Sequence, residues 1–234
     1  MRYTRQELKQ DRLQETAADA MHWSVVHRKN LTMIGIVLAV IVVAAIGGGW
    51  YYTYHNEQAN NALGTAMLIN GAPILPKGAA PEQVLTFATI PERAAAAKTS
   101  FYDVSSKYGS TRAGRFARYM AGVTEVELGN NKAAEEDFKA VSEVSDQNVA
   151  NLARFALASV YRDTNREADA IAIYKALSEH PSETVPKVTA QLELAELYTA
   201  KQPDEAKKIY AQIQKDNPKA LAAEVAGQHL KDMK

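Results

Sequence analysis

The residues of this sequence that could do chemistry are its histidines, its neighbouring carboxylates and a run of three glycines. The five histidines do not share a helical face at the spacing of a metal site. Gly47-Gly48-Gly49 lacks the Lys-Ser/Thr that follows the glycines of a phosphate-binding loop. Carboxylate pairs such as Glu135-Glu136 are typical of a solvated surface. The sequence therefore predicts no catalytic site, metal site, cofactor or small-molecule substrate, and the chain is not expected to be an enzyme.

Two arginines, Arg118 and Arg154, stand 36 residues apart at equivalent positions of the sequence. A guanidinium can hold a carboxylate through two parallel hydrogen bonds, so the pair could bind a carboxylate-bearing ligand. The alternative, which we favour, is that each arginine pairs with acidic residues of a neighbouring helix. Both interpretations depend on the repeated elements that position the two side chains.

The same interval recurs along the chain, which is the sequence signature of a repeat array. Three similar segments follow one another at steps of 36 and 37 residues: FARYMAG at 116–122, LARFALA at 152–158 and TAQLELA at 189–195. Later in each unit a small residue precedes an aromatic residue by four positions. These pairs are Ala134 and Phe138, Ala170 and Tyr174, and Ala206 and Tyr210.

Each unit is predicted to be a hairpin of two amphipathic helices. Turn residues separate the two helices at 128–131, 163–165 and 201–204, and prolines at 181 and 218 end the second and third units. Small residues, such as Gly122 in the first unit, would let the two helices of a hairpin cross closely. A further second helix is predicted over 91–108. A closing helix is predicted over 219–233, with Leu221, Val225 and Leu230 as its apolar residues.

On these features the chain resembles a tetratricopeptide repeat array over about residues 112–218. It departs from the family in its longer steps, in the absence of the first-helix Trp, and in Glu125, where the family usually has Tyr. The resemblance implies an all-α, helical-hairpin solenoid that binds protein partners along a concave wall formed by the first helix of each unit. By position, that peptide-binding groove would comprise Phe116, Tyr119, Val123, Val126, Leu152, Phe155, Ser159, Arg162, Thr189, Leu192, Glu196 and Thr199. The alternative is that the apolar members of this set only pack the hairpins together.

The stretch from Leu31 to Trp50 contains twenty residues and no charge. At 1.5 Å per residue a helix of this length covers about 30 Å, the thickness of a bilayer's hydrocarbon core. Aromatic residues follow as far as Tyr54, and we predict a transmembrane helix over 31–54. Gly35, Ala39 and Gly47–Gly49 could admit a membrane-embedded partner helix. Otherwise, the three glycines are expected to loosen the helix where it leaves the bilayer.

Residues 1–30 carry a net charge of +2, with Arg28 and Lys29 next to the apolar stretch, whereas its other flank has no Lys or Arg. Positive charge beside a span favours the cytoplasmic side. We therefore expect a cytoplasmic head over 1–30, with a capping box at Thr4 and Glu7. A membrane-proximal helix and linker would follow over 55–90, and the repeat domain with its capping helix over 91–234. A cleaved signal peptide is the alternative, but the long head of mixed charge argues against it.

The part of the chain after the apolar stretch has a net charge of −2, so nucleic acid is not an expected partner. A single span followed by such an array resembles the YfgM-like family, ancillary subunits beside the bacterial Sec translocon that cooperate with periplasmic chaperones. The resemblance implies a bacterial inner-membrane protein whose periplasmic array assists secreted or envelope proteins. The alternative is a fixed accessory subunit of another inner-membrane complex, respiratory or envelope-building.

Overall fold

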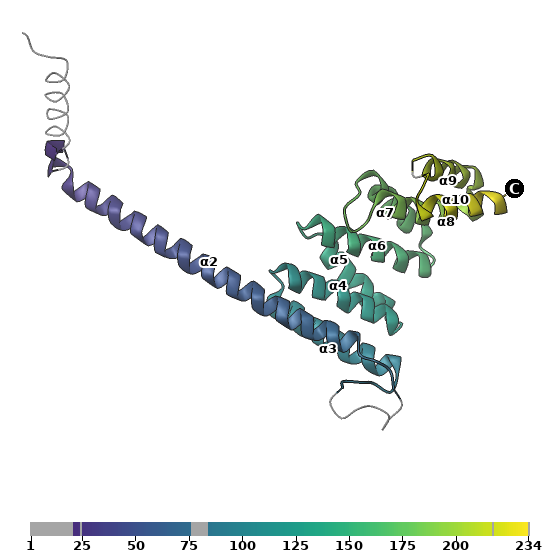
Figure 1. Cartoon of the computed structure of the whole chain (residues 1–234), viewed down its shortest axis with the longest axis horizontal. Coiled ribbons are helices and arrows are strands. Elements are labelled where there is room, and N and C mark those ends of the chain that lie inside the picture. The colour runs from purple at the N-terminus through teal and green to yellow at the C-terminus, as the bar shows by residue number, and fades with distance from the viewer. Residues whose placement is uncertain (1–20, 24, 76–83, 217, 234) are drawn as a thin grey trace, which may run out of the picture. The chain divides into compact units, whose positions relative to one another are not determined.

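The computed structural model describes residues 21–23, 25–75, 84–216 and 218–233. Thr4, Glu7 and most of the predicted head lie outside the described residues. The helices are α2 (Arg28–Asn70), α3 (Ile90–Tyr108), α4 (Arg112–Glu127), α5 (Asn131–Ser142), α6 (Gln147–Asp163), α7 (Glu167–Glu179), α8 (Lys187–Lys201), α9 (Pro203–Asp216) and α10 (Leu221–Asp232) (Figure 1). Within the described ranges an isolated bridge between Ile74 and Phe87 is the β pairing present. The predicted all-α fold is confirmed.

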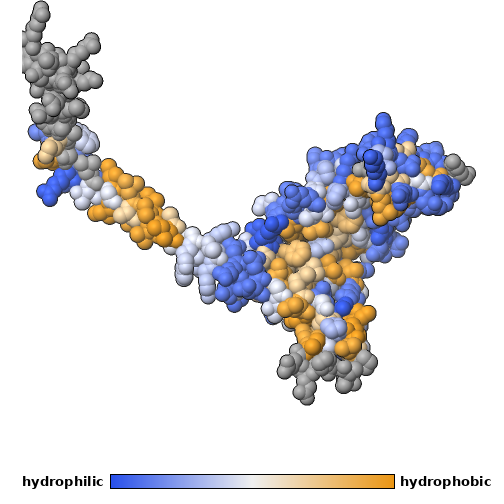
Figure 2. Space-filling model, viewed as in Figure 1, coloured by the Kyte–Doolittle hydropathy of each residue, from blue (hydrophilic) through white to orange (hydrophobic). Residues whose placement is uncertain are grey.

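The chain divides into two compact units between Tyr54 and His55. The first contains the N-terminal part of α2, which is long and apolar enough to cross a membrane. Apolar side chains such as Ile36 and Val43 are exposed there, and Figure 2 shows this part of the helix covered by hydrophobic surface. α2 continues unbroken through Gly47–Gly49, so the helix does not end there, and its loosening at the edge of a bilayer stays a prediction.

The second unit is an array of helical hairpins, α4 with α5, α6 with α7, and α8 with α9. From α3 to α10 every helix packs on the next along the chain, and α4 also packs on α6. Figure 1 shows this succession from teal to yellow. Packing between neighbours in sequence is the rule that defines a solenoid.

The residues that carry the sequence repeat form the core of this array. Phe138, Tyr174 and Tyr210 are at most 1% exposed, and the small residues paired with them are fully buried. Gly122 explains why small residues recur, because a Cβ placed there would lie 2.7 Å from the Phe138 ring. Asn165 adopts a positive φ of 60° in its turn, as Gly and Asn do most readily.

A fourth hairpin precedes the three that the sequence pattern identifies. Its second helix is α3, in which Thr89 caps the N-terminus by accepting a hydrogen bond from the Glu92 N–H at 3.3 Å. Its first helix is the C-terminal part of α2, where Ala59 and Ala66 pack in one cluster with Phe101. The helix expected within the membrane-proximal region 55–90 is thus the C-terminal part of α2, and it is the partner of α3.

The closing helix is present as α10, but two of the apolar residues expected to seal the array do not do so. Leu221 is 74% exposed and Val225 is 38% exposed, whereas Ala223 and Ala226 are buried. The prediction was wrong about which face packs, because alanines allow α10 to approach α9 more closely than larger side chains would. Leu230 does pack against the core of the last hairpin, as expected.

Candidate functional site

The twelve residues predicted to form a groove lie on the first helices of the three hairpins. Four belong to each of α4, α6 and α8, and every one of the twelve side chains keeps some exposed surface. We refer to this set as the first-helix face. Its residues are Phe116, Tyr119, Val123, Val126, Leu152, Phe155, Ser159, Arg162, Thr189, Leu192, Glu196 and Thr199.

Aromatic side chains on this face rest on the buried aromatic residues of the second helices. The Tyr119 ring lies 5.7 Å from the Phe138 ring and 5.6 Å from Phe116, and the Phe155 ring lies 5.3 Å from Tyr174. Burial raises the pKa of Tyr119, so its phenol is neutral at physiological pH. The rings therefore have fixed inner edges and exposed outer edges, which combines the packing role with an accessible apolar surface.

The first-helix face extends over all three hairpins. Direct packing joins α4 to α6. From α6, the Arg162 Nη1 donates a hydrogen bond of 2.5 Å to Glu193 on α8. Arg162 is thus already paired within the array, and the exposed carboxylate of Glu196 leaves the α8 end of the face more polar than the α4 end.

The two equivalent arginines have different partners. Arg118 donates a hydrogen bond to Asp137, as expected from local pairing. Arg154 instead donates to the Ser142 carbonyl at 2.7 Å and to the Asn151 Oδ1 at 3.0 Å. Local pairing with an acidic residue is therefore right for Arg118 and wrong for Arg154, because the C-terminal end of α5 presents a backbone carbonyl to this side chain instead.

Two models of known protein families match the chain. Residues 25–177 match the model of the tetratricopeptide repeat-like domain, and residues 189–220 match a tetratricopeptide repeat model. The chain belongs to the tetratricopeptide repeat-like domain family. Searches of curated proteins and of solved structures return no match. Arrays of this family generally mediate protein–protein interactions and are typically non-catalytic scaffolds.

A buried polar cluster that the sequence did not reveal lies between α3 and the hairpin of α4 and α5. Asp137 and Glu125 are 2% and 5% exposed. The Tyr102 hydroxyl of α3 donates to Asp137 at 2.6 Å, and Asn130 donates to Glu125 at 2.7 Å. Burial, and next the bond to Asp137, raise the pKa of Tyr102 well above its usual range. Glu125, the departure from the family's usual Tyr, is thus accommodated by a cluster that ties α3, α4 and α5 together.

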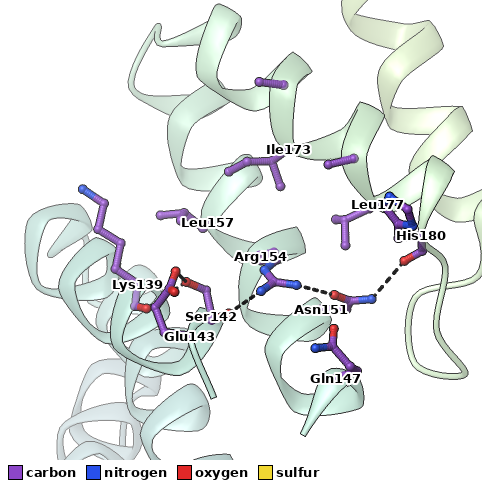
Figure 3. Close-up of a pocket in the computed structure, with 12 residues that line it drawn as sticks. Lys139, Ser142, Glu143, Gln147, Asn151, Arg154, Leu157, Ile173, Leu177 and His180 are labelled. Carbon is purple, nitrogen blue, oxygen red and sulfur yellow. Dashed lines mark hydrogen bonds between the residues drawn. The ribbon is translucent and has the colours of Figure 1, made fainter. Parts of the chain in front are cut away.

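A pocket of about 640 Å³ lies between α5 and α7, over α6. Figure 3 shows Leu157 and Ile173 on one side of it, and Arg154, Asn151 and Gln147 together on the other. Its residues are distinct from the first-helix face. The repeat pattern of the sequence did not predict this pocket.

An ion-pair cluster joins the α4–α5 hairpin to the α6–α7 hairpin. Arg166 donates through both terminal nitrogens to Glu135, and the Lys139 Nζ lies 2.6 Å from the same carboxylate. The Arg166 guanidinium also lies 4.1 Å from the centre of the Tyr161 ring. Hydrogen bonding from Arg166, first among its causes, lowers the pKa of Glu135 to about 2.

Glu135→Gln is expected to remove a pH-dependent part of the stability. A carboxyl whose pKa is lowered by folding contributes stability above its unfolded pKa of about 4.3, and that contribution disappears as pH falls toward 2. Because water screens the partly exposed arginine, we expect a loss of about 1 kcal/mol at pH 7 and almost none at pH 2. Urea unfolding at both pH values measures this difference. Glu136→Gln, at the exposed neighbour, is the control, and an equal effect of both substitutions would contradict the assignment.

Proposed function

We propose that the chain is a membrane-anchored scaffold whose array binds segments of other proteins along the first-helix face. The supporting observation is the partial exposure of Tyr119 and Phe155, two aromatic residues held in place by core contacts. Aromatic residues are enriched at the energetic centres of protein interfaces. Rings that are already ordered lose little conformational entropy when a partner covers them.

The proposed anchor is the apolar part of α2, with a span over 31–54 and a cytoplasmic head over 1–30. Trp50 and Tyr54, stacked with ring centres 5.7 Å apart and both exposed, suit the outer membrane interface. The remaining proposed divisions are the linker region 55–90 and the repeat domain 91–234. In this arrangement the array lies on the periplasmic side of a bacterial inner membrane.

A partner within the membrane could dock against the small residues of α2. A Cβ added at Gly35 or at any of Gly47–Gly49 would meet no atom of the described residues within 4 Å. These positions, with Ala39, therefore leave room for the close approach of another helix. In line with the resemblance to YfgM-like subunits, the proposed partner is the Sec translocon, where the array would receive or assist emerging secreted and envelope proteins.

A second candidate function is that of a fixed accessory subunit in another inner-membrane complex. The firm support beneath Tyr119 and Phe155 favours neither candidate over the other, because a permanent partner and a transient one would both use an ordered apolar face. The two candidates differ in how many partners occupy this face and for how long.

Site-specific photocrosslinking in intact cells tests these candidates. A photoreactive amino acid in place of Phe155 is expected to crosslink to several unrelated secreted chains, and the same group in place of exposed Lys132 on α5 is the control. One partner at stoichiometric yield would establish the fixed subunit instead. Equal, low crosslinking at both positions would contradict a binding role for the first-helix face.

The proposed orientation is tested by using the absence of cysteine from the chain. A single cysteine in place of exposed Ser106, on α3, is expected to react with a membrane-impermeant maleimide in intact spheroplasts. Labelling only after the membrane is broken would place the array in the cytoplasm and overturn the periplasmic assignment.

A further inference from the structure

The pocket between α5 and α7 has chemistry that differs from that of the first-helix face. Its apolar side is lined by Leu157, Ile173 and Leu177. Ala172 and Ala176 of α7 line the same side, and both are exposed. Leu157 and Leu177 are 5% and 2% exposed, so the surface that this side presents to solvent comes mainly from Ile173 and the two alanines. A ligand that covers this surface would remove it from water, which favours binding.

The opposite side of the pocket contains a cation without a carboxylate partner among the residues that the structure describes. Most arginines of the array reach a carboxylate: Arg93, Arg112, Arg118, Arg162 and Arg166. Arg154 has two neutral acceptors, the Ser142 carbonyl and the Asn151 amide oxygen. A guanidinium has five N–H groups, so further donors remain for an anion.

The other polar residues of the pocket favour an anion at Arg154. Asn151 is held in place, since its amide nitrogen donates to the His180 carbonyl at 3.3 Å. Lys139 adds a second cation at the rim, although it pairs with Glu135. The carboxylate that lines the pocket, Glu143, accepts a hydrogen bond of 3.3 Å from the Ser142 hydroxyl. The lining thus has two cationic residues and one anionic residue, and Arg154 is the cationic residue that has no carboxylate partner among the described residues.

We propose that this pocket binds an aliphatic carboxylate of medium chain length. The carboxylate lies on the Arg154 guanidinium, and the hydrocarbon chain covers Ala172, Ile173 and Ala176. The volume of about 640 Å³ is in the range of ligand pockets. A bound peptide would bring amide groups that need hydrogen-bond partners, and the alanine, isoleucine and leucine side chains of the apolar side offer none. A hydrocarbon chain has no such requirement.

The test uses the full chain in lipid nanodiscs and an octanoate that carries a photoreactive diazirine on its chain. Mass spectrometry is expected to locate the label on the lining residues of α6 and α7. Unlabelled octanoate should compete, whereas octylamine, with the same chain and the opposite charge, should compete at least tenfold less well. Equal competition by both, or labelling confined to α2, would overturn the proposal.

Two variants separate binding from folding. Arg154→Gln is expected to weaken labelling about tenfold or more, the usual effect of losing a charge-assisted hydrogen bond. Arg115→Gln is the matched control, because Arg115 also bonds a backbone carbonyl, that of Ser110, but lies outside the pocket. Ala176→Glu leaves every described hydrogen bond in place and should abolish labelling by putting a carboxylate in the pocket.

Thermal unfolding of each variant shows whether the array is intact. Unchanged labelling in a folded Arg154→Gln or Ala176→Glu protein would overturn the assignment.

A peptide with a C-terminal leucine supplies the remaining comparison. If its free acid displaces the probe more strongly than octanoate does, and its amide does not, the pocket binds polypeptide ends and the aliphatic ligand is wrong. These outcomes do not depend on whether the first-helix face binds protein.

Discussion

Gly114→Ala is expected to lower the free energy of unfolding of the array by about 3 kcal/mol, at the upper end of overpacking effects. Gly114 lies in the first turn of α4, and its N–H donates to the Thr111 hydroxyl that caps this helix. A Cβ at this position would lie 2.0 Å from the Tyr108 carbonyl oxygen and 2.8 Å from the Gly109 nitrogen. Both are backbone atoms, so no side-chain rotation can relieve the contact. The last turn of α3 and the first turn of α4 would have to separate.

Gly64→Ala is the matched control for this substitution. Gly64 lies in the C-terminal part of α2, and a Cβ there would meet no described atom within 4 Å. Alanine is a better helix former than glycine, so this variant is expected to keep or gain up to about 1 kcal/mol. Urea unfolding followed by far-ultraviolet circular dichroism compares the two. If Gly114→Ala is as stable as Gly64→Ala, the close approach of α3 and α4 does not constrain the fold as described.

The contrast between Gly122 and Gly114 shows what a repeat pattern can predict. Gly122 recurs as alanine in the following units, so the sequence alone identified it as a site of close helix packing. Gly114 precedes the similar segments, and its contact with Tyr108 depends on how the short connection between α3 and α4 turns. Local geometry of this kind leaves no periodic trace in a sequence.

The candidate sites also differ in how far the repeat pattern could predict them. Residues of the first-helix face could be located because each has a fixed place in a repeated helix, and all twelve retain exposed surface. Arg154 also has a repeated place, equivalent to Arg118, yet the two have different partners. Asp137 lies within hydrogen-bonding distance of Arg118, whereas the corresponding position on α7 is Ile173, which cannot accept a hydrogen bond. Because α7 has Ile173 where α5 has Asp137, Arg154 lacks the carboxylate partner that Arg118 has. Both Arg154 and Ile173 line the pocket.

Asp137→Ala is expected to cost about 3 kcal/mol of unfolding free energy. The carboxylate is 2% exposed and accepts hydrogen bonds from Tyr102 and Arg118, on two different helices. Removal of the carboxylate leaves the partly buried Tyr102 hydroxyl and the Arg118 guanidinium without this acceptor. Breaking a buried charged pair costs about 3–5 kcal/mol, and the lower value applies because the Arg118 side chain is 41% exposed and can turn to water.

The neighbouring Glu136→Ala substitution is the control for Asp137, since Glu136 is exposed on the same helix and should change stability by less than about 0.5 kcal/mol. Tyr102→Phe completes the comparison, because it removes the hydroxyl but keeps the ring. If Tyr102 and Asp137 act through their shared hydrogen bond, the double variant loses less stability than the two single losses combined. Strict additivity would mean that the bond does not couple α3 to α5. In that case the cation–π contact of Arg118 over Tyr102, at 5.7 Å, would remain as a described link between Tyr102 and the first hairpin.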